Sequence, residues 1–288
     1  MPSTYAHYRM GQEIERMMTG KEKTVIKNYL DLFHIGLHGP DILFYYHPLQ
    51  TNQINSIGYG MHERAGCQFF EHAADVIKEK ECSQEYLAYV YGFICHFALD
   101  VTCHGYVDEK IKQSGISHGE IEVEFDRELM VMDGFDPVRH RLTNHIVVKD
   151  EISDVIQSFY QGVTKDDVNK ALRGMKFYNN LLLAPTKTKR GFIHALLRIS
   201  GNYQEMHGLM VNFKKNEKCN DSTRRLMLLY EGAIHLAMRL IREYHKYLIG
   251  EMELDYTYQY TFGSKLVKEK EKEKEKGDCI YEIQIDKP

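Results

Sequence analysis

The sequence predicts an all-α protein, a multi-helix bundle whose pattern leaves room for a short C-terminal β-hairpin. Two observations predict this class. Apolar residues recur every three or four positions along most of the chain, as at Met10, Ile14 and Met17, which is the spacing of one face of a helix. Glycines such as Gly20 and Gly250 follow the ends of these periodic stretches, where helices commonly stop.

The helices are expected in the following order along the chain. We predict them over residues 4–18, 22–34, 57–80, 118–133, 147–160, 165–183, 190–200 and 222–249, with a long helix that begins at Ser83 or Glu85. The stretch GLHGPDILFYYHP, residues 36–48, contains two prolines and is predicted to be a loop crowded with polar groups. No internal repeat is evident.

The C-terminal end has a different composition from the rest. Residues 253–262 and 279–285 alternate and are rich in residues that favour strands, and the alternating Lys/Glu run KEKEKEKEK, residues 268–276, separates them. We therefore divide the chain into an all-α domain, residues 1–252, and a charged tail, residues 253–288. The Lys/Glu run is expected to be a solvated linker because its charges nearly cancel and bury nothing.

Composition excludes some classes of function. The 288 residues are 43% hydrophobic and 27% charged, enough for a substantial core, and the net charge of -4 argues against stable nucleic-acid binding over a broad surface. The N-terminal stretch lacks the apolar core of a signal peptide, and no segment has about 18 uninterrupted apolar residues, so we expect a cytoplasmic protein without a transmembrane segment. The six cysteines show no C-x-x-C spacing and are expected to be reduced thiols. The oligomeric state is not indicated.

The stretch CHFALDVTCHGYVDEK places His96, Asp100 and His104 four residues apart within a predicted helix. Residues at this spacing project from one face, about 6 Å from each other. The two histidines are about 12 Å apart along the axis, whereas a Zn–N bond is about 2 Å, so one ion cannot bind both without breaking the helix. Two ions could be bound, with Asp100 bridging them through its two oxygens.

Further metal ligands are expected on the inward faces of other helices. His118 and Glu122 repeat the spacing of four, and His7 and His62 align with the apolar residues of their helices. A single inward histidine is more often a hydrogen-bonded core residue than a ligand. So many core-facing polar groups together are most simply satisfied by metal. The remaining histidines are assigned to surface, loop or ordinary core positions: His34, His38, His47, His72, His140, His145, His194, His207, His235 and His245.

Two other helical metal scaffolds fit the sequence poorly. Ferritin-like di-iron bundles use Glu-x-x-His pairs, and no histidine in this chain has a glutamate three residues before it. The metal-dependent phosphohydrolases with an adjacent His-Asp pair should show that dipeptide, which is also missing from the sequence.

Five motifs, in the same order along the chain, resemble the zinc-dependent phospholipase C family, whose all-α fold is shared with single-strand-specific zinc nucleases. The motifs are TYAHYRMG, GPDILFYYHP, GYGMHERAG, HFALDVTCHGYV and HGEIE, and the likeness covers residues 1–250. The resemblance implies a phospholipase C/nuclease-like bundle with a site of three zinc ions, of which His62, His96 and Asp100 would hold one. His104, His118 and Glu122 would hold a second ion, and His7 with Asp100 a third. Asp41 would orient or deprotonate the attacking water.

The resemblance also sets limits on these expectations. Secreted members of the family use the amine of an N-terminal tryptophan as a ligand, and this chain contains no tryptophan, so we expect two to three zinc ions. The separate lipid-binding domain of those enzymes is not evident in the short, charged tail.

Clustered divalent ions activate water and hold phosphoryl oxygens, so the expected activity of residues 1–252 is zinc-dependent phosphodiester hydrolysis. We predict a phospholipase C-type cleavage that releases a phosphorylated head group from a phospholipid. A nuclease-like phosphoesterase of the same fold and a non-catalytic metal-binding protein are the alternatives. The last is disfavoured because structural zinc sites are usually closed and often built from cysteines.

Overall fold

The computed structural model describes residues 4–199, 201, 203 and 207–267, and within this part of the chain the protein is built from helices without a sheet. The α-helices are α1 (Thr4–Met17), α2 (Gly20–Asn28), α3 (Leu30–Gly36), α4 (Gln53–Glu63), α5 (Gly66–Glu79), α6 (Gln84–Ser114), α7 (His118–Met132), α8 (Asp150–Gln157), α9 (Lys165–Leu182), α10 (Lys187–Ile199) and α12 (Asn220–Leu248). The 3₁₀ helices are η1 (Gly39–Tyr45), η2 (His207–Leu209), η3 (Glu217–Cys219) and η4 (Tyr256–Gln259). The predicted all-α class is thus confirmed.

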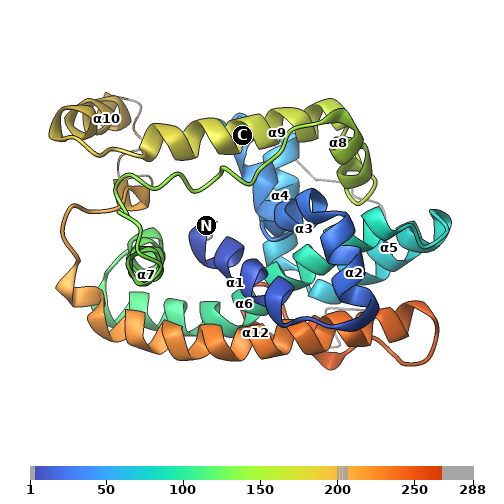
Figure 1. Ribbon diagram of the computed structural model, residues 1–288. Helices are drawn as coiled ribbons and strands as arrows, with labels where there is room; N and C mark the ends of the chain where they lie inside the picture. The colour runs from blue at the N-terminus through green and yellow to red at the C-terminus, as the bar shows by residue number, and fades with distance from the viewer. Residues whose placement is uncertain (1–3, 200, 202, 204–206, 268–288) are drawn as a thin grey trace.

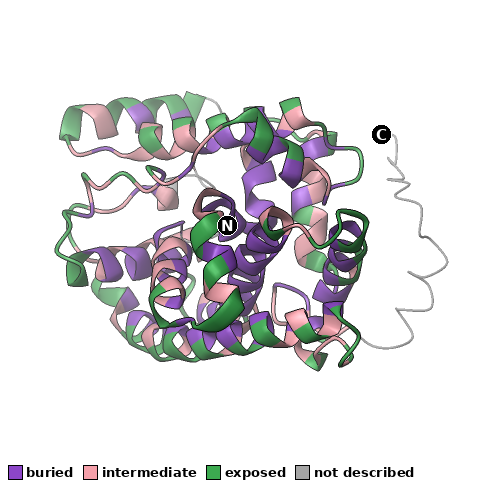
Figure 2. Ribbon diagram, turned by 45° about the vertical axis from the view of Figure 1, so that its right-hand side comes forward, coloured by how far each residue is buried: buried purple, intermediate pink, exposed green. Residues whose placement is uncertain are grey.

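The long helix α6 forms the centre of the fold, and α12 runs beside it at the base of the view in Figure 1. Most of α6 is enclosed by α1, α2, α3, α5, α7 and α12, as the buried residues in Figure 2 show. By length and composition alone, helix α6 is long and apolar enough to cross a membrane. However, 83% of its apolar 18-residue stretch is buried inside the protein. Its composition is therefore explained by its place in the core.

Two glycines let α3 approach the backbone of α6. A Cβ at Gly92 would lie 2.1 Å from the carbonyl oxygen of Phe33, and one at Gly36 would lie 2.2 Å from that of Tyr89. Any side chain at either position would force the two helices apart. This contact holds η1, which follows α3 directly, against the middle of α6.

Two predicted helices are each divided in the structure. The helix predicted over 22–34 is interrupted at Tyr29, which separates α2 from α3. The helix predicted over 57–80 is interrupted between α4 and α5, where the Gly66 N–H donates to the carbonyl of Tyr260 and Ala65 pairs with Thr261 in an isolated bridge. This break arises from a contact nearly 200 residues away in sequence, which local periodicity does not report.

Residues 36–48 and 253–262 also differ from expectation. The predicted polar loop contains the 3₁₀ helix η1, with Gly39 to Phe44 buried. Residues 253–262 form η4 and two isolated bridges in place of a strand, because Tyr258 and Phe262 enter the helical core against Phe70 and Phe97. The second predicted strand, residues 279–285, and the Lys/Glu run lie outside the described residues.

Candidate metal centre

The row on α6 lies on one buried face, as the spacing of four predicts. His96, Asp100 and His104 are all buried. Asp100 is the centre of this face: Oδ1 lies 3.3 Å from Nε2 of His7, and Oδ2 lies 3.3 Å from Nε2 of His96. Oδ2 is also 3.7 Å from Nε2 of His62. The two oxygens therefore face different histidines, an arrangement suited to a carboxylate that bridges two ions.

Asp41 completes a second group beside Asp100. It lies in η1 and is fully buried, deeper than a loop residue at the rim of a site would be. Its Oδ1 is 3.0 Å from Nε2 of His62, and ligand atoms of Asp41, His62 and His96 all lie within 4.8 Å of each other. Gly39, with a φ of 48°, brings this segment so close to α6 that a Cβ there would lie 2.3 Å from the His96 ring.

The third group joins α6 to α7. Nε2 of His104 is 3.3 Å from Oε1 of Glu122, and Nε2 of His118 is 2.9 Å from the same oxygen. Helix α7 begins at His118, where the Ser117 side chain accepts the N–H of Glu120 and caps the helix. This cap orients the first turn of α7, so that His118 and Glu122 both face His104.

Helix α1, which carries His7, is held in place by a third residue at the spacing of four on α7, after His118 and Glu122. Asp126 follows Glu122 by four residues and is buried. Its two oxygens accept the backbone N–H groups of Tyr5 (2.9 Å) and Ala6 (2.8 Å). A carboxylate at a helix N-terminus satisfies otherwise unpaired donors and the helix dipole. The α7 row thus supplies two candidate ligands and then positions a third on α1.

Three histidines are oriented by backbone carbonyls. Since a carbonyl can only accept, each Nδ1 carries the hydrogen: His62 donates to Gly58 (2.9 Å), His96 to Leu37 (3.3 Å) and His104 to Phe262 (2.9 Å). Each Nε2 then points at a carboxylate of Asp41, Asp100 or Glu122. In a neutral imidazole with hydrogen on Nδ1, Nε2 is an acceptor, and two facing acceptors repel unless a cation or a proton lies between them.

The pattern of unsatisfied atoms fits zinc. Within this cluster the buried side-chain atoms without a hydrogen-bond partner are Nε2 of His96 and His118, both carboxylate oxygens of Asp41, and Oδ2 of Asp100. Leaving so many polar atoms buried and unpaired is costly. Imidazole nitrogens and carboxylate oxygens are both zinc ligands, and a carbonyl-bonded Nδ1 is the usual way in which a metal-binding histidine is held. The residues present therefore fit the zinc ions expected.

The charges of the metal-free cluster are set by opposing effects. Burial raises the pKa of Asp100, but the neighbouring His104 and His96 outweigh burial and hold that pKa well below its usual range. Burial also raises the pKa of Glu122, but the neighbouring His118 outweighs burial, so that this pKa is lowered. For His104, burial lowers the pKa but Asp100 and Glu122 raise it further, to about 9. The cluster without metal is thus held together partly by protons on histidine.

A second histidine cluster, made of residues that the sequence places at ordinary core, loop or surface positions, lies beside the first. Nε2 of His38 is 2.7 Å from Nε2 of His145, and the ring of His145 stacks on Tyr8 at 3.8 Å. His34 packs edge-on against His145. Burial lowers the pKa of His34 to about 4 and that of His145 to about 3, so these rings are neutral at pH 7. Groups of three ligand atoms close enough for one ion are found, within the described residues, only in the first cluster.

Residues 256–267, here named the C-terminal strap, cross the same site. Phe262 is buried against the rings of His62 and His96, and its carbonyl binds His104. Ser264 ties the strap to α6: its hydroxyl donates to the Val101 carbonyl (2.7 Å) and accepts the Gly105 N–H (3.0 Å). The alternation of aromatic residues in this segment was visible in the sequence, but it had suggested a strand.

The fold and the site together define an α-helical protein with a buried cluster of histidines and carboxylates that could hold metal, the composition expected of a metal-dependent hydrolase. A family model described as zinc-dependent phospholipase C matches residues 6–181. Because the match covers more than half of the chain and includes all eight predicted site residues, the protein belongs to the zinc-dependent phospholipase C family. Neither the curated proteins nor the solved structures gave a match. The family assigns the protein to zinc-dependent hydrolases of phosphoester bonds.

Proposed function

We propose that this protein hydrolyses the phosphodiester bond of a phospholipid on its glycerol side, which releases a phosphorylated head group. The observation that carries the proposal is the set of three histidines whose Nδ1 atoms bind backbone carbonyls while their Nε2 atoms face buried carboxylates. Membership in the phospholipase C family supports the substrate class.

We propose the following ligand sets for two to three zinc ions. His62 and His96, with Asp100, would hold one ion, and Asp41 is close enough to share it. His104, His118 and Glu122 would hold a second. His7 and Asp100 would contribute to a third. When bound, zinc supplies a lowered pKa for a coordinated water and positive charge for the phosphoryl oxygens and the leaving alkoxide.

The protein's own residues handle the proton. Asp41 is the proposed base, because its oxygens are buried and lack hydrogen-bond partners, and His62 lies beside them. It would accept a proton from the water that attacks phosphorus and orient that water for an in-line approach. Asp100 would keep the histidines around it in a fixed arrangement.

Head-group release tests the proposal directly. Zinc-loaded protein should release phosphocholine or another phosphorylated head group from short-chain phospholipids more rapidly than it cleaves single-stranded DNA. Cleavage of the DNA without head-group release would favour the nuclease-like alternative. Full zinc occupancy without turnover of either substrate would favour the non-catalytic alternative.

A further inference from the structure

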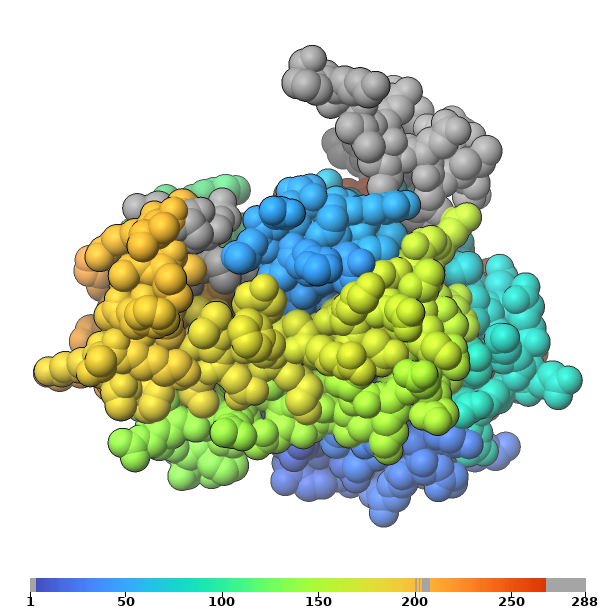
Figure 3. Space-filling view, turned by 90° about the horizontal axis from the view of Figure 1, so that it is seen from above, coloured from blue at the N-terminus to red at the C-terminus, as the bar shows by residue number. Residues whose placement is uncertain are grey.

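The charges of this protein are unevenly distributed along the chain. Residues 168–199, which form most of α9 and all of α10, contain seven Lys and Arg residues and no Asp or Glu. This leaves 30 of the 37 basic residues and all 41 acidic residues to the rest of the chain. A region with seven positive charges thus belongs to a protein whose net charge is -4. Figure 3 shows that α9 and α10 lie together on one face of the molecule.

Helix α10 also exposes a row of large apolar side chains. Phe192 is 64% exposed, Leu196 is 44% exposed and Ile199 is 84% exposed. Their spacing of four and three residues places them on one face of the helix. Lys187 and Arg198 are also exposed and lie on one side of the helix, about 120–140° around it from Phe192 at 100° per residue. A helix that combines an exposed apolar row with exposed basic residues on its polar side has the pattern of a helix that binds a membrane surface.

The attachment of α10 explains why this row faces outward. Its opposite face, with Ile193 and Leu197, packs with Ala184 and Met210 in a small apolar cluster separate from the main core. Arg190 fixes the same side by donating to the carbonyl of Val211. Figure 1 shows α10 at one extremity of the molecule, away from α6 and α12. The contacts that anchor α10 therefore do not involve the exposed apolar row.

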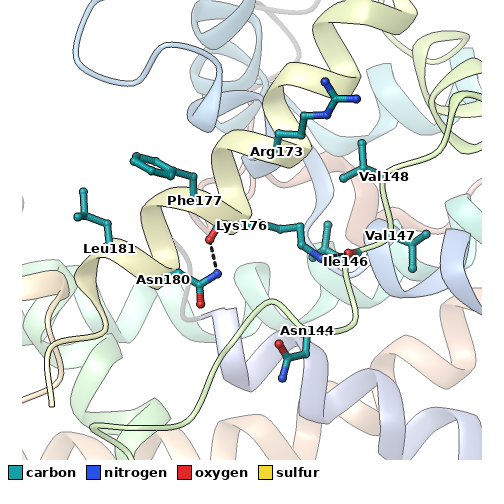
Figure 4. A pocket seen from close by; sticks show the side chains of 9 residues that line it. All are labelled: Asn144, Ile146, Val147, Val148, Arg173, Lys176, Phe177, Asn180 and Leu181. Carbon is teal, nitrogen blue, oxygen red and sulfur yellow. Dashed lines mark hydrogen bonds between the residues drawn. The ribbon is translucent and has the colours of Figure 1, made fainter.

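The same surface continues along α9 to a hollow of about 780 Å³. Arg173, Lys176 and Phe177 line it from α9, and Phe177 is 61% exposed (Figure 4). The other wall is the segment 144–148. Within this segment His145 is not a lining residue, and its side chain contacts His38 instead. One backbone segment thus separates the basic surface from the histidine cluster beside the metal centre.

We propose that the exposed face of α10, together with Phe177 of α9, docks this protein onto an anionic phospholipid surface. Charge complementarity selects this occupant, because the cytoplasmic leaflet of a membrane attracts basic segments and repels the acidic remainder of the chain. The three apolar side chains of α10 insert between the lipid head groups. The biological use of this surface rests on the proposed phospholipid substrate, but docking itself requires no turnover.

Vesicle sedimentation tests the docking surface. We would compare pure phosphatidylcholine vesicles with vesicles containing about one-third phosphatidylserine, at low and high salt. The parent should bind the anionic vesicles more tightly, and salt should weaken the binding. The variant Phe192→Ser/Leu196→Ser/Ile199→Ser should lose at least about tenfold in partitioning, and Lys187→Glu/Arg198→Glu should lose the preference for anionic lipid. Measurements with Asp41→Asn, which blocks the proposed turnover, exclude effects of lipid hydrolysis.

Matched changes elsewhere on the surface control for these variants. Val131→Ser/Met132→Ser alters two exposed apolar residues on α7, and Lys246→Glu alters an exposed cation on α12. Both should bind vesicles like the parent. The α10 variants should also keep the parent's rate on a monomeric short-chain phospholipid and its melting temperature, which separates docking from folding.

The possible outcomes distinguish docking from catalysis. If the parent hydrolyses the monomeric lipid but does not sediment with anionic vesicles, or if the triple variant binds like the parent, the docking surface is wrong. If docking behaves as expected but no phospholipid is hydrolysed, the proposed function fails and the surface stands. If the parent is a dimer that the triple variant dissociates, and vesicles are not bound, the face joins two copies of the chain and the proposal is overturned.

Discussion

The metal centre has two parts that are stabilised in different ways. The inner group consists of His7, Asp41, His62, His96 and Asp100, and the outer triad consists of His104, His118 and Glu122. Four of the five unpartnered buried atoms, on His96, Asp41 and Asp100, belong to the inner group. In the outer triad, both histidines face one carboxylate oxygen, and the strap carbonyl binds His104.

This difference indicates what metal does in each part. The inner ligands come from α1, η1, α4 and α6, and the unpartnered atoms among them lie in η1 and α6, where these two elements meet in the core. The outer ligands come from α6 and α7 and already compensate one another through a protonated His104. We therefore expect the stability of the fold to depend mainly on the inner ions, and the outer ion to depend on the strap.

The largest effect is expected for Asp100→Asn. The change removes an anionic oxygen from the centre of the inner group and leaves neighbouring dications poorly screened from each other. Bound zinc should fall by more than one ion per chain, the melting temperature should drop, and turnover should fall by at least about 10⁴-fold. Elemental analysis and thermal melting with and without added zinc measure this. Retention of all zinc with an unchanged melting temperature would show that Asp100 is an ordinary buried acid.

Asp41→Asn should separate catalysis from metal binding within the inner group. The amide cannot act as the proposed base, so turnover should fall by about 10²–10⁴-fold while folding and most of the zinc are retained. Steady-state rates and zinc content measure the two effects. Asp31→Asn, at a half-exposed acid paired with Lys149, is the control and should behave like the parent. Full activity of Asp41→Asn would refute the proposed role.

Ser264→Ala should weaken the outer triad more than the inner group. It removes the hydroxyl that ties the strap to Val101 and Gly105, so the Phe262 carbonyl no longer holds His104 in place. Loss of such an orienting contact typically weakens metal affinity by about 10–100-fold. Zinc titration should show one weakened ion, whereas Lys265→Ala, at an exposed strap residue, should show none. Equal weakening of all ions would mean that the two parts are not independent.

The smallest expected effect is the pH dependence of zinc binding at the outer triad. Because the pKa of His104 is raised to about 9, its imidazole is protonated at pH 7 without metal, and zinc must displace that proton. Outer-site affinity should therefore rise with pH, about tenfold per unit, and level off near pH 9.

The same raised pKa bears on the stability of the metal-free protein. The stabilisation that comes from protonated His104 is complete below its unfolded pKa of about 6.5 and is lost as pH rises through about 9. Calorimetry in buffers of different ionisation enthalpy should detect about one proton released with the outer zinc at pH 7. His104→Ala should abolish that release, and an unchanged release would contradict the assignment.

Local sequence was sufficient for the parts of the site that lie on one helix. The spacing of four placed His96, Asp100 and His104 on a single face of α6, and the structure confirms that all three are buried there. The same spacing on α7 could have identified Asp126 as a third member of the row. That Asp126 caps α1 depends on how two helices meet, which periodicity does not encode.

Contacts between distant segments account for what the sequence did not reveal. His38 follows His34 by four residues, the same spacing as in the row on α6, but His145 is 107 residues further along the chain and no pattern in the sequence links it to them. Asp41 was expected on a polar loop, but the close contact of Gly36 and Gly92 carries its segment into the core. Phe262 binds His104 through a backbone carbonyl, a group that every residue has, so no side-chain pattern could have marked it.

The position of the strap has a consequence for the biosynthesis of this protein. All eight predicted site residues lie within the stretch from His7 to Glu122, so the whole ligand set is translated well before Phe262. The carbonyl that orients His104 belongs to Phe262, which is made after all of these residues and after α12. A nascent chain can therefore gather the inner ligands early in translation, whereas the outer triad reaches its final geometry only after the strap has been made.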